Sequence, residues 1–211
     1  MSKDSLLSRR HLGMILVKLV LSSVVLACLL VLLSGCISIS FTGFPKPDRP
    51  FPADVFMLDE SDFPPGSKVE PIAIDSEEDG AGEHLVRTVY LPGGSLAVQV
   101  LRGYGSAERA AREFQRNLKS VFGHGPEYSE WVVPKELQHY HSLVADQFKV
   151  ACGIHGSQEY CRMSAQYEEY YVVLSIGMRP PMTYADVERV LQALDARFAA
   201  KLKEPDSTPT P

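Results

Sequence analysis

The sequence lacks the short motifs from which catalysis or nucleotide binding is usually predicted. It contains no phosphate-binding P-loop, no G-x-G-x-x-G dinucleotide fingerprint, no H-E-x-x-H metal motif and no G-x-S-x-G nucleophile elbow. Cysteine is also scarce, with four residues in a chain of 211. These absences exclude no fold, but they leave few local signatures of positioned catalytic groups.

Positive charge is in short supply beyond the first residues of the chain. Residues 1–35 hold four basic residues and one acidic residue, whereas the whole chain holds 21 and 26. The remaining residues therefore carry 17 basic and 25 acidic side chains, a net charge of −8. A domain with this charge repels phosphate backbones, so we expect no nucleic acid partner.

The first 35 residues have the layout of a secretory signal peptide. A polar, basic start precedes an uncharged apolar run over residues 19–33, and the small residues Ser34 and Gly35 follow that run. An uncleaved transmembrane helix is the alternative, because the apolar stretch 19–39 is 21 residues long and a bilayer requires about 20. Both interpretations place the following domain outside the cytoplasm, because the positive charges stay inside.

The residues Leu33-Ser34-Gly35-Cys36 resemble the lipobox of bacterial lipoproteins. The resemblance implies that the Cys36 thiol receives a diacylglyceryl group, that residues 1–35 are removed, and that acyl chains such as palmitate anchor the protein in a membrane of the cell envelope. It also implies that the domain faces outside the cytoplasm. The paired arginines near the start resemble a twin-arginine export signal as well, but the apolar run favours the general secretory route.

Proline marks the boundary between a tether and a domain. Four prolines occur within residues 45–52, where they prevent a helix or a regular sheet ladder and favour extended polyproline II. We therefore expect a lipidated cysteine and proline-rich tether over residues 36–53. A single domain should follow over residues 54–203, and a polar, proline-rich, disordered tail over residues 204–211.

Segments of the domain in which apolar residues recur at every second position alternate with segments in which they recur at helical spacing. Apolar alternation predicts strands over residues 69–74, 85–91, 95–102, 143–151, 161–167 and 171–178. Ser106 is a candidate helix cap, and the apolar positions of the helix after it recur at three- and four-residue spacing. Thr183 and Asp186 stand at the capping-box distance before a last helix, whose apolar stripe is Val187, Leu191, Leu194, Phe198 and Leu202.

This order of strands and helices predicts an α+β fold. Consecutive strands joined by short turns pair antiparallel, and two amphipathic helices can cover the resulting sheet. We expect both helices on one face. The element order resembles that of the small PsbP/Mog1-type sandwiches of exported proteins. Because this resemblance includes no diagnostic motif, it implies no functional residues.

Cys152 and Cys161 are expected to form a disulfide bond. An exported protein meets an oxidising compartment, and these two cysteines bracket a short loop between two predicted strands. Cys28 lies in the apolar run, and Cys36 is the proposed lipid site. A redox or nucleophilic cysteine is the alternative, but no C-x-x-C motif is present to lower a thiol pKa.

His139 and His141 are the candidate metal ligands. Residues two apart in a strand share a face, so both imidazoles can reach one metal ion, with His124 or Asp146 as a possible third ligand. That arrangement would support a metal-assisted hydrolase. The alternative interpretation is a pair of exposed polar residues before the next strand. We expect no resident metal or cofactor.

We expect a membrane-anchored binding or accessory module in preference to an enzyme, with metal-assisted hydrolysis by His139 and His141 as the alternative. Its partner would be an envelope protein or a small ligand. Binding requires only a shaped and partly apolar surface. The loop 153–160 can contribute one, and so can four tyrosines that otherwise pack within the sheet, namely Tyr160, Tyr167, Tyr170 and Tyr171. The acidic pair Glu168 and Glu169 could be recruited to acid–base chemistry, but we expect it in a solvated loop.

Overall fold

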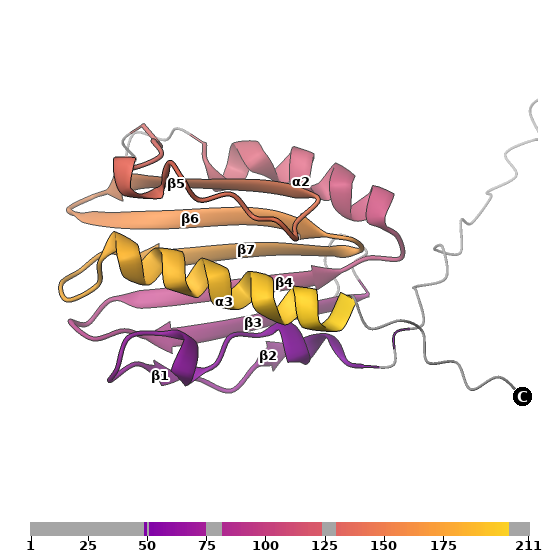
Figure 1. Ribbon diagram of the computed structural model, residues 1–211, viewed down its shortest axis with the longest axis horizontal. Helices are drawn as coiled ribbons and strands as arrows, with labels where there is room; N and C mark the ends of the chain where they lie inside the picture. Colours follow the sequence, from indigo (N-terminus) through magenta and orange to yellow (C-terminus); the bar gives the residue numbers. More distant parts are fainter. Residues whose placement is uncertain (1–48, 50, 75–81, 124–129, 203–211) are drawn as a thin grey trace, which may run out of the picture. The chain divides into compact units, whose positions relative to one another are not determined.

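The computed structural model describes Arg49 and residues 51–74, 82–123 and 130–202. Within these ranges the chain forms a single α+β unit, drawn in Figure 1. Its strands are β1 (Lys68–Val69), β2 (Ala73–Ile74), β3 (Glu83–Tyr90), β4 (Leu96–Gly103), β5 (Gln147–His155), β6 (Gln158–Tyr167) and β7 (Tyr170–Gly177). Its helices are α2 (Ala107–Val121) and α3 (Tyr184–Leu202), and its 3-10 turns are η1 (Ala53–Phe56), η2 (Glu60–Asp62) and η3 (Lys135–Leu137).

The seven strands form one antiparallel sheet. Its order is β1-β3-β4-β7-β6-β5, and β2 pairs with β3 beside β1. The long strands pair as hairpins, β3 with β4, β5 with β6, and β6 with β7, while β4 pairs with β7 in the centre. The α+β class and the antiparallel sheet are therefore confirmed.

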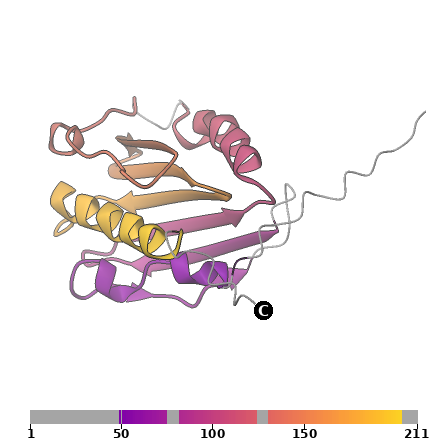
Figure 2. The same cartoon turned by 45° about the vertical axis from the view of Figure 1, so that its right-hand side comes forward.

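The two helices lie on opposite faces of the sheet, so the expectation that both cover one face was wrong (Figures 1 and 2). Side chains of β7 show the division. Val172 and Leu174 belong to the large core beneath α3, whereas Tyr171 packs with Phe114 of α2 in a smaller core. Alternate residues of a strand point to opposite faces, and β7 is apolar on both of them. One helix therefore covers each face.

Both predicted helix caps are present. The Ser106 hydroxyl accepts a hydrogen bond from the Arg109 N–H at 3.3 Å and begins α2. Before α3, the Asp186 carboxylate accepts from the Thr183 N–H at 3.0 Å, and the Thr183 hydroxyl accepts from the Asp186 N–H at 3.2 Å. These reciprocal bonds are a capping box with aspartate in place of the usual glutamate.

The fifth strand begins later than the sequence pattern predicted. Residues 143–146 form turns instead of strand, because the Ser142 hydroxyl accepts hydrogen bonds from the N–H groups of Val144 and Ala145. The side chain of Leu143 is 97 % exposed as a result. The expected strand over residues 69–74 is also divided into β1 and β2.

The segment before β1 contributes to the core under α3. Phe56 of η1 stacks on Phe198 of α3, with ring centroids 4.1 Å apart and planes 3° from parallel. Phe198 stacks in turn on Tyr167 at 3.9 Å. Gln99 of β4 holds the same segment, because its amide accepts from the Leu58 N–H and donates to the Phe56 carbonyl. These contacts fix η1 against the sheet.

Candidate functional site

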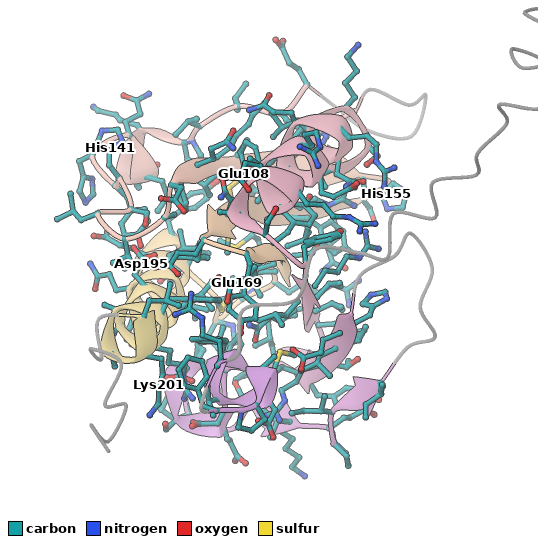
Figure 3. All side chains as sticks on the ribbon, turned by 90° about the vertical axis from the view of Figure 1, so that its right-hand side faces the viewer. Glu108, His141, His155, Glu169, Asp195 and Lys201 are labelled. Carbon is teal, nitrogen blue, oxygen red and sulfur yellow. A yellow bond between two sulfur atoms is a disulfide. The ribbon has the colours of Figure 1, made fainter. Side chains whose placement is uncertain are left out.

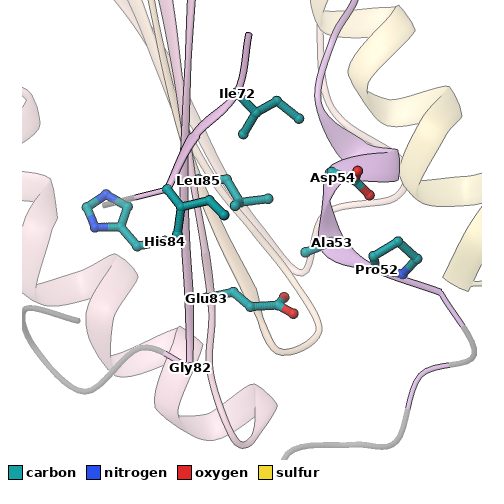
Figure 4. Close-up of a pocket in the computed structure, with 9 residues that line it drawn as sticks. Pro52, Ala53, Asp54, Ile72, Gly82, Glu83, His84 and Leu85 are labelled. Atoms are coloured by element: carbon teal, nitrogen blue, oxygen red, sulfur yellow. The ribbon is translucent and has the colours of Figure 1, made fainter. Parts of the chain in front are cut away.

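A cavity of about 410 Å³ lies between η1 and the corner formed by β2 and β3 (Figure 4). We call it the η1 pocket. Its lining comes from the η1 segment, from Ile72 and Ile74, and from the first residues of β3. Its volume falls within the range of about 300–1,000 Å³ typical of small-molecule sites.

The lining of the η1 pocket is mostly apolar, with two carboxylates. Leu85 and Ile72 project into it from the sheet side and face Ala53, as Figure 4 shows. Glu83 extends in the same direction as Leu85, two residues further along β3, and Asp54 lies on the η1 side. The pocket therefore combines an apolar surface with negative charge.

Strand alternation explains which β3 side chains reach the pocket. Glu83 and Leu85 point toward η1, whereas the ring of His84 points to the other side of the strand (Figure 4). Gly103 lies opposite Glu83 in the register with β4. A Cβ atom at position 103 would come within 3.3 Å of Glu83 Oε2, so glycine leaves room for this carboxylate.

An ion-pair cluster, which we call the Arg49 clamp, attaches the N-terminal segment to the β6–β7 turn. The Arg49 guanidinium donates to both carboxylate oxygens of Glu169 at 2.7 and 2.9 Å and also pairs with Glu168. The Glu169 side chain is only 2 % exposed. Hydrogen bonding to Glu169 raises the pKa of Arg49 above its ordinary value, opposed by partial burial. The expectation of a solvated loop was therefore wrong for Glu169.

The backbone of the β6–β7 turn is strained at Glu168. Its φ is +49°, a conformation that non-glycine residues rarely adopt. The Asp146 carboxylate stabilises the turn by accepting from the Glu168 N–H at 2.7 Å. Strain of this kind persists only where the surrounding structure holds it. In this turn the strained backbone places the carboxylates of Glu168 and Glu169 next to Arg49.

The two candidate metal ligands line a groove next to α3, together with Leu143, Glu188 and Asp195, and we call it the histidine groove. His139 is in a turn and His141 is in an irregular segment, so neither is in a strand, and both are exposed. Figure 3 shows the His141 ring at the outer edge of the molecule. His139 Nε2 contacts Glu188 Oε1 at 3.2 Å.

Within the described ranges, no three His, Cys, Asp or Glu residues are placed to hold a metal ion. Asp146, one candidate for the third ligand, instead supports the β6–β7 turn. His124, the other candidate, lies outside the described residues. The structure therefore gives the pair His139 and His141 no third ligand among these residues.

Asp195 organises the floor of the histidine groove. Its carboxylate accepts hydrogen bonds from the hydroxyls of Tyr140, Ser142 and Tyr167 at 2.7–2.8 Å. Burial, with the nearby Asp195 charge, raises the pKa of Tyr167 well above its ordinary value. These phenols are hydrogen-bond donors that hold the loop before β5 against α3, so the cluster has a structural role.

Three of the four tyrosines considered as a binding surface are core residues. Tyr167, Tyr170 and Tyr171 are each no more than 2 % exposed, whereas Tyr160 is partly exposed. For these three the packing interpretation is confirmed. Burial also raises the pKa of Tyr170, with further contributions from the Glu169 and Glu83 charges.

Cys152 and Cys161 form the expected disulfide. They are directly opposite each other in the β5–β6 register, and both are buried. The strands continue beyond them to a tight turn at Gly156, so the disulfide joins two neighbouring strands within the sheet. The residues 153–160 are consequently strand and turn, not a broad binding loop.

The residues of the proposed export signal, including Cys36, lie outside the described ranges. The described residues include no helix with the length and apolar character needed to cross a bilayer. A scan against protein-family models and a search of curated proteins found no match to the chain.

Proposed function

We propose that the chain is an extracytoplasmic lipoprotein, anchored to a bacterial membrane through Cys36, whose domain binds a ligand or an envelope protein in the η1 pocket. The observation that carries the binding role is the pocket itself. It has the volume of a ligand site and an apolar surface with a few polar groups. Ile74, which also lines the pocket, is 82 % exposed.

The anchor proposal rests on the lipobox-like residues 33–36 and is supported by the disulfide. Disulfides persist mainly in oxidising compartments, which agrees with a domain outside the cytoplasm. The Arg49 clamp holds Arg49, which falls within the expected tether range 36–53, against the β6–β7 turn.

Metal-assisted hydrolysis receives less support. His139 and His141 are exposed, and the described residues place no third ligand with them. Catalysis would also need charged groups fixed around the reacting atoms, and the histidine groove is open to solvent. We therefore place the binding role in the η1 pocket.

Site-specific photo-crosslinking in cells tests this proposal. A photoreactive phenylalanine analogue would replace Ile74 in one variant and Leu143 in another, because both side chains are largely exposed. The first position borders the η1 pocket and the second borders the histidine groove. We expect discrete crosslinked products from position 74 and none from position 143. Products from position 143 alone would move the functional surface to the groove and contradict the proposal.

A further inference from the structure

The outer side of α2 carries a stripe of positive charge. Its basic residues recur at three- and four-residue spacing, which places them along one side of the helix. They are Arg109, Arg112, Arg116 and Lys119. The apolar side of the helix, with Ala110 and Phe114, packs on the sheet. Three of the four basic residues are exposed, and Arg109 is partly exposed. We call these four residues the α2 stripe.

Acidic residues offset only part of this charge. The helix contains two of them, Glu108 and Glu113, and Glu113 pairs with Arg116 of the stripe. Beyond the helix end the stripe is extended by Lys149, an exposed residue of β5 whose ammonium lies 4.5 Å from the centroid of the Phe122 ring. With Lys149, α2 therefore holds five basic and two acidic residues.

The other side of the sheet does not share this charge. α3 lies there, and η1 packs against it through the stacked rings of Phe56 and Phe198 (Figures 1 and 2). α3 contains three acidic and three basic residues, whereas residues 53–62 contain four acidic residues and no basic one. An anionic surface therefore attracts the α2 side of the domain and repels the α3 side.

The start of α2 lies next to the Arg49 clamp. The Glu169 carbonyl accepts from the Tyr104 N–H at 2.9 Å, two residues before the Ser106 cap, and the Glu169 side chain binds Arg49. Arg49 is the thirteenth residue after Cys36. Whatever conformation the intervening chain adopts, it spans at most about 3.6 Å per residue, which keeps Arg49 within about 47 Å of a lipid anchor at Cys36. At such a high effective concentration a weak attraction to the membrane suffices.

These features define a partner for the helix. We propose that the α2 stripe binds the anionic phosphate headgroups of the membrane that holds Cys36. The domain then lies with α2 toward the bilayer and α3 away from it. This inference rests on the lipid anchor proposed above and adds a second contact with the membrane. Exposed arginine and lysine side chains form charge-assisted hydrogen bonds with phosphates, and each basic residue near an anionic surface adds to the attraction.

Trp131 lies at the end of the stripe and supports this assignment. Its ring packs on Phe122, with centroids 5.9 Å apart, and the next two residues, Val132 and Val133, are 55 and 43 % exposed. Aromatic and apolar side chains beside basic ones are typical of surfaces that lie in a membrane interface. Trp131 is also the only tryptophan of the chain, so it reports on the α2 side without any substitution.

Energy transfer from tryptophan to a dansyl-labelled lipid headgroup tests the proposal on the full chain. The protein is purified from bacterial membranes and reconstituted in nanodiscs of phosphatidylcholine alone or of an equimolar mixture with anionic phosphatidylglycerol. We expect more transfer from Trp131 in the anionic nanodiscs. A second reporter chain carries Trp131→Phe and Gln192→Trp, which moves the donor to an exposed position of α3. Its transfer should not increase.

Variants connect the gain in transfer to the stripe. Arg112→Gln combined with Lys119→Gln should remove about half of the gain from Trp131, because these are two of the exposed basic residues. Arg179→Gln combined with Arg189→Gln is the matched control, since it removes the same charge from exposed positions before and within α3. It should leave the gain unchanged, and melting curves verify that both variants fold. Salt at about 1 M, where the Debye length is about 3 Å, should abolish the gain.

Three results would overturn the inference. The first is equal transfer from Trp131 in the two lipid compositions, and the second is an equal loss in the stripe variant and in the control. The third is a gain from position 192 as large as that from Trp131, because the domain would then not be oriented. If a photoreactive residue at position 115, beside the stripe, crosslinks to an envelope protein while Trp131 shows no gain, the stripe binds a protein instead.

The lipid anchor is decided separately by the intact mass of the same preparation. A lipidated protein that shows no gain keeps the anchor and loses the α2 contact. A protein that retains residues 1–35 without lipid, but shows the gain and its loss in the stripe variant, keeps the α2 contact and loses the lipid anchor.

Discussion

Arg49 and Glu169 are 120 positions apart in the chain and form a two-point ion pair, with both carboxylate oxygens of Glu169 accepting from the guanidinium. The carboxylate is almost fully buried, so the arginine compensates a charge that would otherwise be costly to remove from water. The pair joins the end of the proposed tether to the turn between two central strands. The contact therefore fixes Arg49 to the folded domain.

Arg49→Ala should destabilise the domain by about 1–3 kcal/mol, because it leaves the Glu169 carboxylate buried without this partner. Denaturant unfolding measures the change. Arg189→Ala is the control, since Arg189 is 53 % exposed and pairs with Asp186 at the surface. It should cost less than about 0.5 kcal/mol. Equal costs for the two variants would mean that the clamp adds no more than a surface ion pair.

The disulfide should stabilise the folded domain. Chemical labelling of the unreduced, denatured protein should find no free thiol at Cys152 or Cys161, and labelling after reduction should find both. Loss of the crosslink should lower stability by about 2–3 kcal/mol in the loop-entropy model, and so lower the melting temperature. Quantitative labelling of both cysteines before reduction would contradict the disulfide.

Leu194→Ala should cost about 2–5 kcal/mol, because the Leu194 side chain is fully buried between α3 and the sheet. Gln192→Ala, at an exposed position of the same helix, should change stability by less than about 0.5 kcal/mol. Unfolding midpoints in urea give both values. Similar losses in the two variants would contradict the orientation of α3.

Asp195 follows Leu194 in α3 but is not a fully exposed position. It is partly buried and accepts three hydroxyl hydrogen bonds. Asp195→Ala should cost about 1–3 kcal/mol, because the hydroxyls of Tyr140 and Tyr167 lose their acceptor. Unfolding in urea tests this value. A loss in the free energy of unfolding smaller than that of Gln192→Ala would contradict it.

Acid should weaken the contact between η2 and α3. Hydrogen bonding from the Ser61 hydroxyl, with the Arg197 guanidinium nearby, lowers the pKa of Asp59 from 3.8 to about 2. A lowered folded-state pKa means that the unfolded chain binds the proton first as the pH falls. The stabilisation is therefore complete above pH 3.8 and is lost as the pH falls through that value toward 2.

Melting curves across this pH range test the assignment to Asp59. The melting temperature of the wild type should fall as the pH falls. That of Asp59→Asn should fall by less, because the titrating carboxylate is gone. Asp54→Asn is a control on a neighbouring exposed carboxylate. An unchanged pH profile in Asp59→Asn would show that other carboxylates carry the acid sensitivity.

The fold class was predictable because its determinants are local. Apolar alternation identified the β3–β4 hairpin and the strands around Cys161, and the caps at Ser106 and Thr183 identified where the helices begin. The faces covered by the helices were not predictable in the same way. A strand such as β7, apolar on both faces, does not specify which helix covers which face.

The candidate site depends on contacts between distant segments, and this is why the sequence did not reveal it. The η1 pocket joins residues near position 53 to residues near position 83, and the clamp joins Arg49 to Glu169. No periodicity connects such positions. One local signal was available in Glu168-Glu169, where two acidic residues occupy a tight hairpin turn, but in the sequence they read as a solvated pair.

Intact-mass measurement of the protein purified from bacterial membranes tests the central proposal most directly. A lipoprotein anchored at Cys36 should have the mass of residues 36–211 plus its acyl groups, and Cys36→Ala should keep residues 1–35 and lose the lipid. A wild-type mass that includes residues 1–35 without added lipid would contradict the lipid anchor. The apolar run would then be an uncleaved membrane-spanning segment.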